Sequence, residues 1–293
     1  MTTTTAQSKD AAQAACRALG MDPRGLTPLR IHATAVYLLP GQETVVRVSP
    51  GSRAEAIERA TALTRWLADQ DFPCVEPLYR PVNHEHHVVS FWRHYPQGRR
   101  EQPPAEHLGG LLRQLHDLPP PPLDLPVYQP LATLQQAVTG SSCLSQTTRT
   151  WLTQTCDNLI RAYQDLESPL GTGLVHADAY PGNTLWDGRD GTLVRLGDWD
   201  EAATGPRELD LANTYQGTRF GRTPAELDAF TRAYGYDPRA WEGLPVLIAI
   251  RDLHTLGSFI RRADTGDTQA TRQLQHRLDT LRSGDTTTRW DIF

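Results

Sequence analysis

Two carboxylates and one carboxamide lie on a turn-rich stretch in the second half of the chain. Asp178 and Asn183 are spaced five apart, and Asp198 follows after a further turn-rich segment. Phosphoryl transfer requires a carboxylate that orients and deprotonates the acceptor hydroxyl, and oxygen ligands that hold Mg²⁺ against the nucleotide phosphates. The spacing of Asp178 and Asn183 matches the catalytic base and a metal ligand of the kinase template. These three side chains therefore indicate phosphoryl transfer.

Short strands and a hairpin are expected to position these side chains. Apolar residues at 174–175 predict a strand that ends at the polar cluster, and a second apolar run begins at 185–186. Two Asp-Gly pairs within 187–191 are typical of a hairpin turn. The return strand is expected at 193–196, so that it delivers Asp198 at its end. The alternative interpretation is a solvated acidic loop beside a hairpin.

A longer pattern extends from these residues. It reads His176-x-Asp178-x-x-x-x-Asn183, then Asp198-Trp199-Asp200, then Asp210-Leu211-Ala212. This pattern resembles the aminoglycoside phosphotransferase family, whose members are small-molecule kinases with a protein-kinase-like fold. The resemblance implies that Asp178 is the catalytic base and that Asn183 and Asp198 bind Mg²⁺. It also implies that His176 braces the loop and that Asp210 anchors it.

The only lysine of the sequence, Lys9, lies in the N-terminal segment that is expected to be disordered. The cation for the nucleotide phosphates is therefore expected to be an arginine. Arg47, on a strand expected over 44–48, is the candidate, since arginine is always charged and can bind phosphate through two donors. The segment 52–55 reads as a capping box that opens a helix. Glu58, one turn further on, is then the expected partner of Arg47. An exposed arginine and a solvent-facing glutamate are the alternatives.

The last strand of the first lobe is expected over 88–95. By the resemblance, adenine lies beneath this strand and binds backbone groups near Phe91 and Arg93. The sequence has no Gly-rich loop of the kinase type, and the turn after the strand expected over 29–39 offers only Gly41. Nucleotide contacts in that turn are therefore not assigned.

The order of elements, together with the resemblance, predicts an α+β, bilobal, protein-kinase-like fold. A small N-terminal β-sheet lobe with a helix is expected over 1–97, and a larger, mainly helical lobe over 98–293. Residues 1–9 are expected to be disordered. Further helices are expected at 10–19, 147–166, 244–260 and 269–281, and one from residue 224 with proline at its first position.

Composition narrows the class of protein. The net charge of −5 argues against a nucleic-acid partner, which normally requires a basic face. No apolar run approaches the length of about 20 residues that a membrane helix needs, and the N-terminus lacks the pattern of a signal peptide. The four cysteines show no metal-type spacing. We therefore expect a cytoplasmic protein with reduced cysteines, a small hydroxylated substrate, and no membrane, nucleic-acid or protein partner.

These observations predict an ATP- or GTP-dependent and Mg²⁺-dependent kinase that phosphorylates a hydroxyl of a small molecule. An aminoglycoside or another antibiotic is one expected substrate, which would make the protein a resistance enzyme. Asp200 and Glu201 are candidate ligands for substrate amines or a second metal, or are solvated. The acidic residues Glu226, Asp228, Asp264 and Asp267 would suit a polycation, although acidic surface helices look the same.

Other functions stay open. The substrate could be a primary metabolite such as choline or a sugar. A nucleotide-binding pseudokinase and a metal-dependent phosphohydrolase are further alternatives. A kinase releases ADP only when an acceptor is present, a phosphohydrolase releases phosphate without an acceptor, and a pseudokinase binds the nucleotide without releasing either product.

Overall fold

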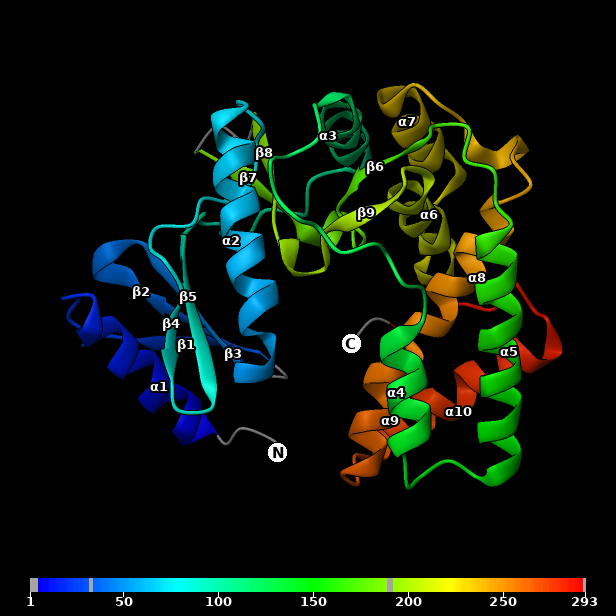
Figure 1. Cartoon of the computed structure of the whole chain (residues 1–293), viewed down its shortest axis with the longest axis horizontal. Coiled ribbons are helices and arrows are strands. Elements are labelled where there is room, and N and C mark those ends of the chain that lie inside the picture. The colour runs from blue at the N-terminus through cyan, green and yellow to red at the C-terminus, as the bar shows by residue number, and fades with distance from the viewer. Residues whose placement is uncertain (1–4, 32–33, 189–191, 292–293) are drawn as a thin grey trace. The chain divides into compact units, whose positions relative to one another are not determined.

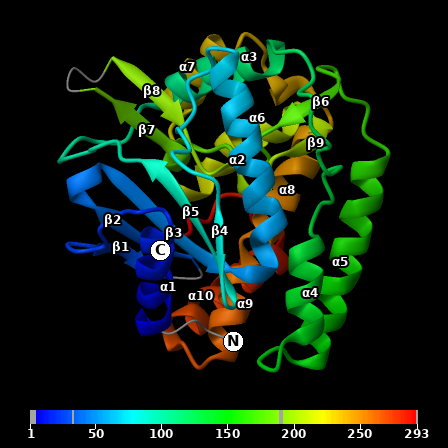
Figure 2. The same ribbon diagram turned by 60° about the vertical axis from the view of Figure 1, so that its left-hand side comes forward.

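The computed structural model describes residues 5–31, 34–188 and 192–291. The chain divides into two compact units, each assembled from segments that are distant in the sequence (Figures 1 and 2). The first unit consists of Met1–Pro103, Asp117–Leu125 and Pro181–Ala202, and the second of Pro104–His116, Pro126–Tyr180 and Ala203–Phe293. The division expected after residue 97 lies near the first of these transitions. The first unit nevertheless includes two later segments that a single boundary leaves out.

An antiparallel five-stranded sheet forms the centre of the first unit, in the order β1-β2-β3-β5-β4. Its strands are β1 (Thr27–Ile31), β2 (Ala35–Leu39), β3 (Thr44–Pro50), β4 (Val82–His84) and β5 (His87–Arg93). The single strand predicted over 29–39 is wrong, because β1 and β2 pair antiparallel and Ile31 lies opposite Ala35. Residues 32 and 33 between them lie outside the described part of the chain.

Helix α1 (Thr5–Ala18) packs against this sheet (Figure 2). Its small side chains, such as Ala12, join Tyr37 and Phe91 in one buried cluster. The Ser8 hydroxyl also bonds the Tyr37 hydroxyl across 2.7 Å. The helix therefore begins before residue 10, contrary to the prediction, and residues 5–9 are helical rather than disordered, because the sheet supplies partners for this turn. Residues 1–4 lie outside the described part.

Helix α2 (Ala54–Asp69) follows a 3₁₀ turn at Gly51–Arg53. The capping box predicted for residues 52–55 is wrong, because the 3₁₀ turn takes up Ser52 and the residue before the helix makes no side-chain cap. Glu55 instead pairs with Arg59 one turn later, at 3.0 Å on the surface.

The predicted hairpin is present in the first unit as β7 (Thr184–Asp187) and β8 (Leu193–Leu196), which pair antiparallel. A 3₁₀ turn at Pro181–Asn183 precedes it and another at Trp199–Glu201 follows it. Residues 189–191 of the predicted turn lie outside the described residues. Thr184 pairs with Leu196, so the next residues outward, Asn183 and Gly197, also lie opposite each other.

The second unit is mainly helical. Its helices are α3 (Ala105–Asp117), α4 (Ala132–Gly140), α5 (Gln146–Gln164), α6 (Glu208–Gln216), α7 (Pro224–Tyr234), α8 (Leu244–His254), α9 (Leu256–Asp264) and α10 (Thr268–Ser283). A two-stranded sheet joins β6 (Thr172–Val175) to β9 (Ala203–Pro206). The α+β class predicted from the sequence is confirmed.

Local sequence signals set several helix boundaries in the second unit. Helix α7 begins with proline at its first position, as predicted, and Thr223 and Glu226 form a capping box at its start. The single helix expected over 244–260 is instead two helices that meet at Thr255. The Thr255 hydroxyl donates to the Asp252 carbonyl across 2.7 Å, and such side-chain bonds compete with regular helix geometry.

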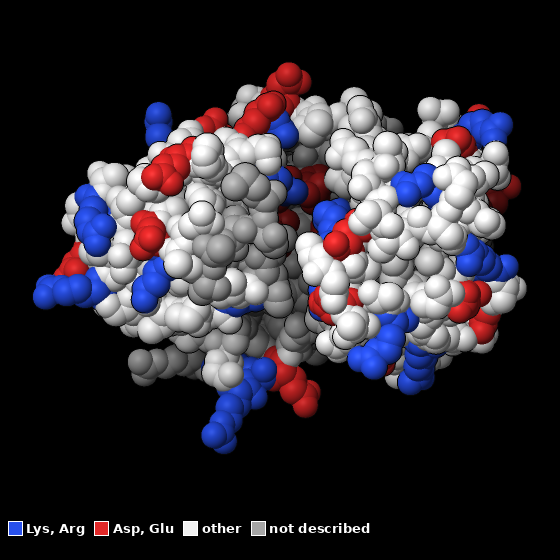
Figure 3. Space-filling view, turned by 90° about the horizontal axis from the view of Figure 1, so that it is seen from below, with Lys and Arg blue, Asp and Glu red and all other residues white. Residues whose placement is uncertain are grey.

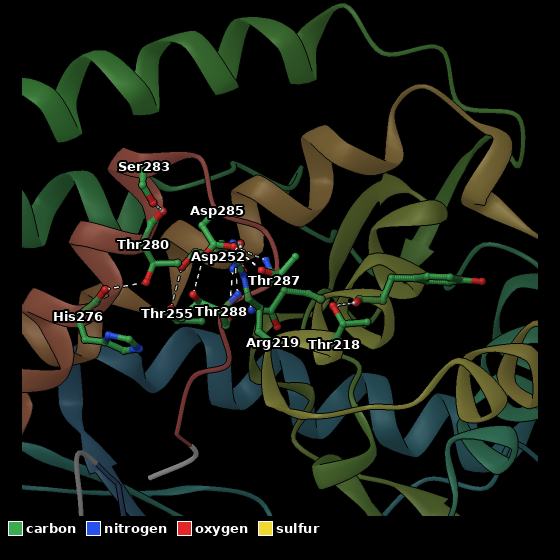
Figure 4. A network of polar contacts seen from close by, with 12 residues as sticks. Thr218, Arg219, Asp252, Thr255, His276, Thr280, Ser283, Asp285, Thr287 and Thr288 are labelled. Carbon is green, nitrogen blue, oxygen red and sulfur yellow. Dashed lines mark hydrogen bonds and ion pairs between the residues drawn. The ribbon is translucent and has the colours of Figure 1, made fainter.

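A buried ion pair ties the C-terminal segment into the second unit (Figure 4). The Arg219 guanidinium donates to Asp252 Oδ2 at 3.0 Å and to the Thr288 carbonyl at 3.2 Å, and it also lies 4.6 Å from the centre of the Trp290 ring. Burial raises the pKa of Asp252, against the lowering effects of Gln216 and Arg219. The segment after α10 is therefore anchored to helix α8.

No described helix combines the length and apolar character needed to cross a membrane. On the face seen in Figure 3, basic and acidic side chains of the described residues are interspersed among uncharged ones. This pattern agrees with the modest net charge of −5. All four cysteines are free thiols, and Cys16, Cys74 and Cys156 are buried.

Candidate active site

The two predicted metal ligands lie side by side in the first unit. Because β7 and β8 pair Thr184 with Leu196, Asn183 lies opposite Gly197, and the Asn183 carbonyl accepts a hydrogen bond from the Gly197 amide at 2.8 Å. Asp198 comes next in the chain, in the left-handed region with φ of 63°. A Cβ on Gly197 would lie 3.1 Å from the Val75 side chain, so a small residue suits this position. The hairpin thus delivers an amide and a carboxylate to one place.

A part-buried arginine contacts this carboxylate. Arg47 on β3 donates through Nη2 to Asp198 Oδ1 at 3.0 Å and to Asp200 Oδ2 at 3.2 Å. Burial alone would lower the pKa of Arg47, but the two carboxylates raise it above its ordinary value. The guanidinium therefore stays charged, and the predicted phosphate-binding cation and the predicted metal ligand contact each other.

The expected partnership of Arg47 with Glu58 is wrong. Glu58 is exposed on α2 and makes no ion pair with the described residues, whereas the carboxylates that face Arg47 come from the segment after β8. The 3₁₀ turn ahead of α2 removes the capping box on which the choice of Glu58 depended.

Arg53 extends the same cluster and was not anticipated from the sequence. Its guanidinium lies 3.5 Å from Asp200 and 3.0 Å from Glu201. The Asp200 side chain is only 10% exposed, so its charge is shared between two arginines. The carboxylates considered for substrate amines are therefore engaged with arginines of the same unit.

The donor set suits Mg²⁺ held together with nucleotide phosphates. Asn183 and Asp198 offer an amide and a carboxylate, which are hard oxygen ligands. Among the described residues, no three His, Cys, Asp or Glu side chains converge as an all-protein metal cage would require. Mg²⁺ commonly binds through one or two carboxylates plus substrate phosphates and waters, so this pair fits such a site without a cage.

The backbone groups predicted to bind adenine are partly occupied. The Phe91 carbonyl accepts a hydrogen bond from the Leu78 amide, and the Arg93 amide donates to the Glu76 carbonyl, both at 2.9 Å. The Arg93 side chain also pairs with Glu76 at 2.7 Å. Those two backbone groups are committed within the first unit because residues 76–78 run along β5, which corrects this part of the prediction.

Asp178 belongs to the second unit, where a buried carboxylate shapes its loop. Asp210 on α6 accepts hydrogen bonds from the His176 and Ala177 amides, each at 2.8 Å, and contacts His116 Nε2 at 3.1 Å. Ala177 is held in the left-handed region with φ of 65°. The Asp178 amide in turn donates to Nδ1 of the fully buried His176 at 3.3 Å. Asp210 thus holds the backbone of this loop at two amides, and His176 holds it at the amide of Asp178.

The Asp178 side chain has a partner that the sequence did not suggest. Arg251 on α8 donates through Nη2 to Asp178 Oδ1 at 2.7 Å, and its Nη1 lies 3.4 Å from the Ala177 carbonyl. Arg251 is 73 residues away from Asp178 in the sequence and lies within an apolar helical run, so no local signal points to it.

The chain passes between the two units within the predicted catalytic motif. Asp178 lies before the transition at Tyr180 and Pro181, and Asn183 and Asp198 lie after it. The first unit brings Asn183, Asp198 and Arg47 together, and the second unit brings Asp178 to Arg251.

Comparison with protein families identifies the class. The family model described as "Phosphotransferase enzyme family" matches residues 26–244. This match covers well over half of the chain, so the chain belongs to that family, and it is a small-molecule kinase. No curated protein matches the sequence.

Solved structures share the fold at low sequence identity. The amicoumacin kinase hAmiN, in complex with AMP-PNP, Ca²⁺ and Ami, has a TM-score of 0.75 and 13% identity, covering 98% of this chain and 97% of its own. A choline/ethanolamine kinase family protein from Mesorhizobium loti has a TM-score of 0.66 and 15% identity, covering 94% of each chain. The aminoglycoside phosphotransferase APH(3'')-Id from Streptomyces rimosus has a TM-score of 0.61 and 17% identity, covering 83% of this chain and 97% of its own. The predicted protein-kinase-like fold is thereby confirmed.

Proposed function

We propose that the protein transfers the terminal phosphoryl group of ATP or GTP, with Mg²⁺, to a hydroxyl of a small molecule. The observation that supports this most directly is the hairpin register that sets Asn183 beside Asp198, with the part-buried cation Arg47 bonded to Asp198. This combination of a hard-oxygen pair and a permanent positive charge is what nucleotide phosphates require.

Asp178 is the proposed catalytic base. Its carboxylate accepts the proton of the acceptor hydroxyl while the hydroxyl oxygen attacks the terminal phosphorus. Arg251 fixes Oδ1 at 2.7 Å and so limits the orientations of the carboxylate. Asp210 sets the backbone of the same loop through the amides of His176 and Ala177.

Asn183 and Asp198 are the proposed metal ligands, and a bound Mg²⁺ would neutralise charge on the nucleotide phosphates. A phosphate group competes with Asp198 for Arg47, and a metal competes with Arg47 for Asp198. The two exchanges compensate. Arg47 loses the negative charge of Asp198 and gains that of a phosphate, and Asp198 loses the positive charge of Arg47 and gains that of the metal. Arg47 therefore serves the inner phosphates once nucleotide and metal are both bound.

The remaining predicted residues are assigned by their contacts. Asp200 and Glu201 orient Arg47 and Arg53 rather than bind substrate amines. We assign no nucleotide contact to Glu58, which is exposed. Backbone groups beyond β5, rather than the occupied groups of Phe91 and Arg93, are the proposed adenine contacts.

A reducing compartment such as the cytoplasm is proposed from the thiols. The pKa values of the buried Cys16 and Cys74 are raised by burial to about 11 and about 12, so these thiols stay protonated. Their role is packing rather than chemistry.

Measurement of ADP and phosphate release across a panel of hydroxylated antibiotics and metabolites tests the proposal. A kinase releases ADP only when an acceptor is present. Acceptor-independent phosphate release would indicate a hydrolase, and nucleotide binding without either product would indicate a pseudokinase. The same panel discriminates an antibiotic from a metabolite such as choline or a sugar.

Two variants sharpen this test. Asp178→Ala is expected to abolish acceptor-dependent ADP release while nucleotide affinity stays nearly unchanged. Asp157→Ala, on the exposed surface of α5, is the matched control and should retain full activity. Normal turnover in Asp178→Ala would remove the assignment of the base.

A further inference from the structure

The last turn of helix α8 carries the arginine that holds the proposed base. Arg251 donates to Asp178 Oδ1 at 2.7 Å, and α8 ends three residues further on, at His254. Helix ends fray because their last carbonyls have no partner within the helix. A well-placed contact between Arg251 and Asp178 therefore requires support for this turn from outside the helix.

That support is applied to the residue next to Arg251. Asp252 leaves the helix axis in another direction, because neighbouring residues of an α-helix are about 100° apart. Its Oδ1 accepts a hydrogen bond from Gln216 Nε2 at 2.8 Å, and its Oδ2 accepts from Nε and Nη2 of Arg219 at 3.1 and 3.0 Å. Figure 4 shows the buried side chains of Arg219 and Asp252 facing each other. These bonds fix the rotation of the turn about the helix axis.

The same contacts close a ring around the loop of the base. Gln216 belongs to α6, the helix whose Asp210 binds the amides of His176 and Ala177 at 2.8 Å each. The ring thus runs from the base to α8, from α8 to α6, and from α6 back to the backbone that precedes the base. A shift of α8 against α6 therefore changes the position of the carboxylate within its loop.

The C-terminal segment holds Arg219 in place. Nη1 of Arg219 donates to the Thr288 carbonyl at 3.2 Å, and the Arg219 carbonyl accepts from the Trp290 amide at 2.7 Å. The guanidinium carbon of Arg219 lies 4.6 Å from the centre of the Trp290 ring, and that of Arg277 lies 4.8 Å from it. The guanidinium of Arg219 is thus bonded to Asp252 and stacked on an aromatic ring, which restricts its orientation.

We propose that Arg219 is a positioning residue for the catalytic base. Through Asp252 it fixes the turn of α8 from which Arg251 holds Asp178, and Trp290 keeps Arg219 in the required orientation. The C-terminal segment then contributes to the chemical step as well as to stability. The inference rests on the proposed function in one respect, because it takes Asp178 to be the base.

Hydrogen exchange tests the positioning without any turnover. Exchange of the peptide 174–180 is followed by mass spectrometry in the full chain, Arg219→Met, Arg251→Met and the double variant. The matched control is Trp151→Leu, which removes a comparable stack, because the guanidinium carbon of Arg282 lies 5.0 Å from the centre of the Trp151 ring. A purely structural role of Arg219 speeds exchange throughout the second unit, whereas positioning speeds it in this peptide and in the last turn of α8.

We expect Arg219→Met and Arg251→Met each to speed exchange of the peptide by about ten-fold. The double variant should exchange no faster than Arg251→Met, because the effects of two residues are not additive when one acts through the other. Trp151→Leu should leave the peptide unchanged. Trp290→Leu, which keeps the pair of Arg219 and Asp252, replaces Arg219→Met in this comparison if the latter does not fold.

Steady-state kinetics test the link to the chemical step. With ATP, Mg²⁺ and each acceptor of the panel that yields ADP, Arg219→Met should lower kcat by about ten-fold and leave the KM for ATP nearly unchanged. In the Arg251→Met background it should lower kcat no further. Arg219→Lys should recover part of the rate, because it keeps a positive charge beside Asp252, and Trp151→Leu should retain full kcat.

The inference is overturned if the effects of Arg219→Met and Arg251→Met on exchange add, if exchange rises equally throughout the second unit, or if kcat stays at the wild-type value. Failure of the kinase proposal looks different. In that case no acceptor of the panel yields ADP, and the exchange measurements alone decide whether Arg219 positions the loop of Asp178.

Discussion

Arg47 and Asp198 form an ion pair of 3.0 Å that joins strand β3 to the second residue after strand β8. Both side chains are assigned to the nucleotide, one to its phosphates and one to its metal. Without nucleotide they neutralise each other. The pair therefore keeps the part-buried guanidinium of Arg47 compensated until phosphates and Mg²⁺ replace its partners.

Removal of this cation should weaken nucleotide binding. Arg47→Met is expected to raise the KM for ATP by about 10- to 100-fold, the range of a lost charge-assisted bond. Steady-state kinetics with a saturating acceptor measure the change. Arg30→Met, an exposed arginine on β1, is the control and should leave the KM unchanged. An unaltered KM in Arg47→Met would contradict the assignment.

The metal ligands should control the demand for Mg²⁺. Asp198→Asn and Asn183→Ala are each expected to raise the Mg²⁺ concentration for half-maximal rate by about ten-fold or more, because each removes or weakens one oxygen ligand. Titration of activity with MgCl₂ at fixed ATP measures this. Asp228→Asn, at a surface pair with Arg239, should give the wild-type curve. Identical curves for all variants would place the metal elsewhere.

Arg251 should act on the chemical step through Asp178. Arg251→Met is expected to lower kcat by about 10- to 100-fold, since a misplaced base loses much of its contribution. The KM for ATP should change little, because the side-chain hydrogen bonds of Arg251 to described residues go to the loop of the base. Arg251→Lys should restore part of the rate by keeping the charge. A variant with normal kcat would show that the 2.7 Å contact is dispensable.

The lowered pKa of His254 predicts acid sensitivity of the fold. His254 has a pKa of about 4 in the folded protein, against 6.5 ordinarily, because burial, Arg251 and Arg261 outweigh Asp178. The unfolded chain binds more protons between these values, so stability is present above pH 6.5 and is lost as the pH falls toward 4. The loss attributable to this residue is up to about 3 kcal/mol.

Urea unfolding at pH 7 and at pH 4.5 measures this loss. His254→Gln should lose less stability than the wild type between the two pH values. His276→Gln, exposed on α10, should match the wild type. Equal losses in the wild type and His254→Gln would show that other groups cause the acid sensitivity.

Two adjacent glycines of α3 should respond oppositely to alanine. A Cβ at Gly109 would lie 2.5 Å from the Phe230 carbonyl, whereas Gly110 has nothing within 4 Å. Gly109→Ala is expected to destabilise the second unit by about 1–3 kcal/mol through overpacking. Gly110→Ala should stabilise it by about 0.5–1 kcal/mol, because glycine is a poor helix former. Thermal unfolding of the two variants checks both signs.

The hairpin that carries the metal ligands could be predicted because its signals are local. Turn residues, two short apolar runs and the spacing of Asp178 and Asn183 all lie within one stretch. The start of α7 at Pro224 was predictable for the same reason. Such features depend on neighbours in the chain, which a sequence displays directly.

Contacts between distant segments could not be predicted in this way. The partner of Asp178 lies 73 residues away, and the carboxylates that face Arg47 lie about 150 residues away, with separations of 151 and 153. The choice of Glu58 followed from a helix start that a 3₁₀ turn displaced. The strand expected over 29–39 contained no turn signal, so its division into β1 and β2 was missed.

The interleaved order of segments in the two units has a consequence for how the gene can be divided. The first unit is completed only by Pro181–Ala202, which is flanked on both sides by parts of the second. Cleavage at a single peptide bond between Pro104 and Pro181 thus separates Pro181–Ala202, with its hairpin, from Met1–Pro103 of the first unit. Activity from a split version would require the two pieces to reassociate, and neither piece is a self-sufficient module.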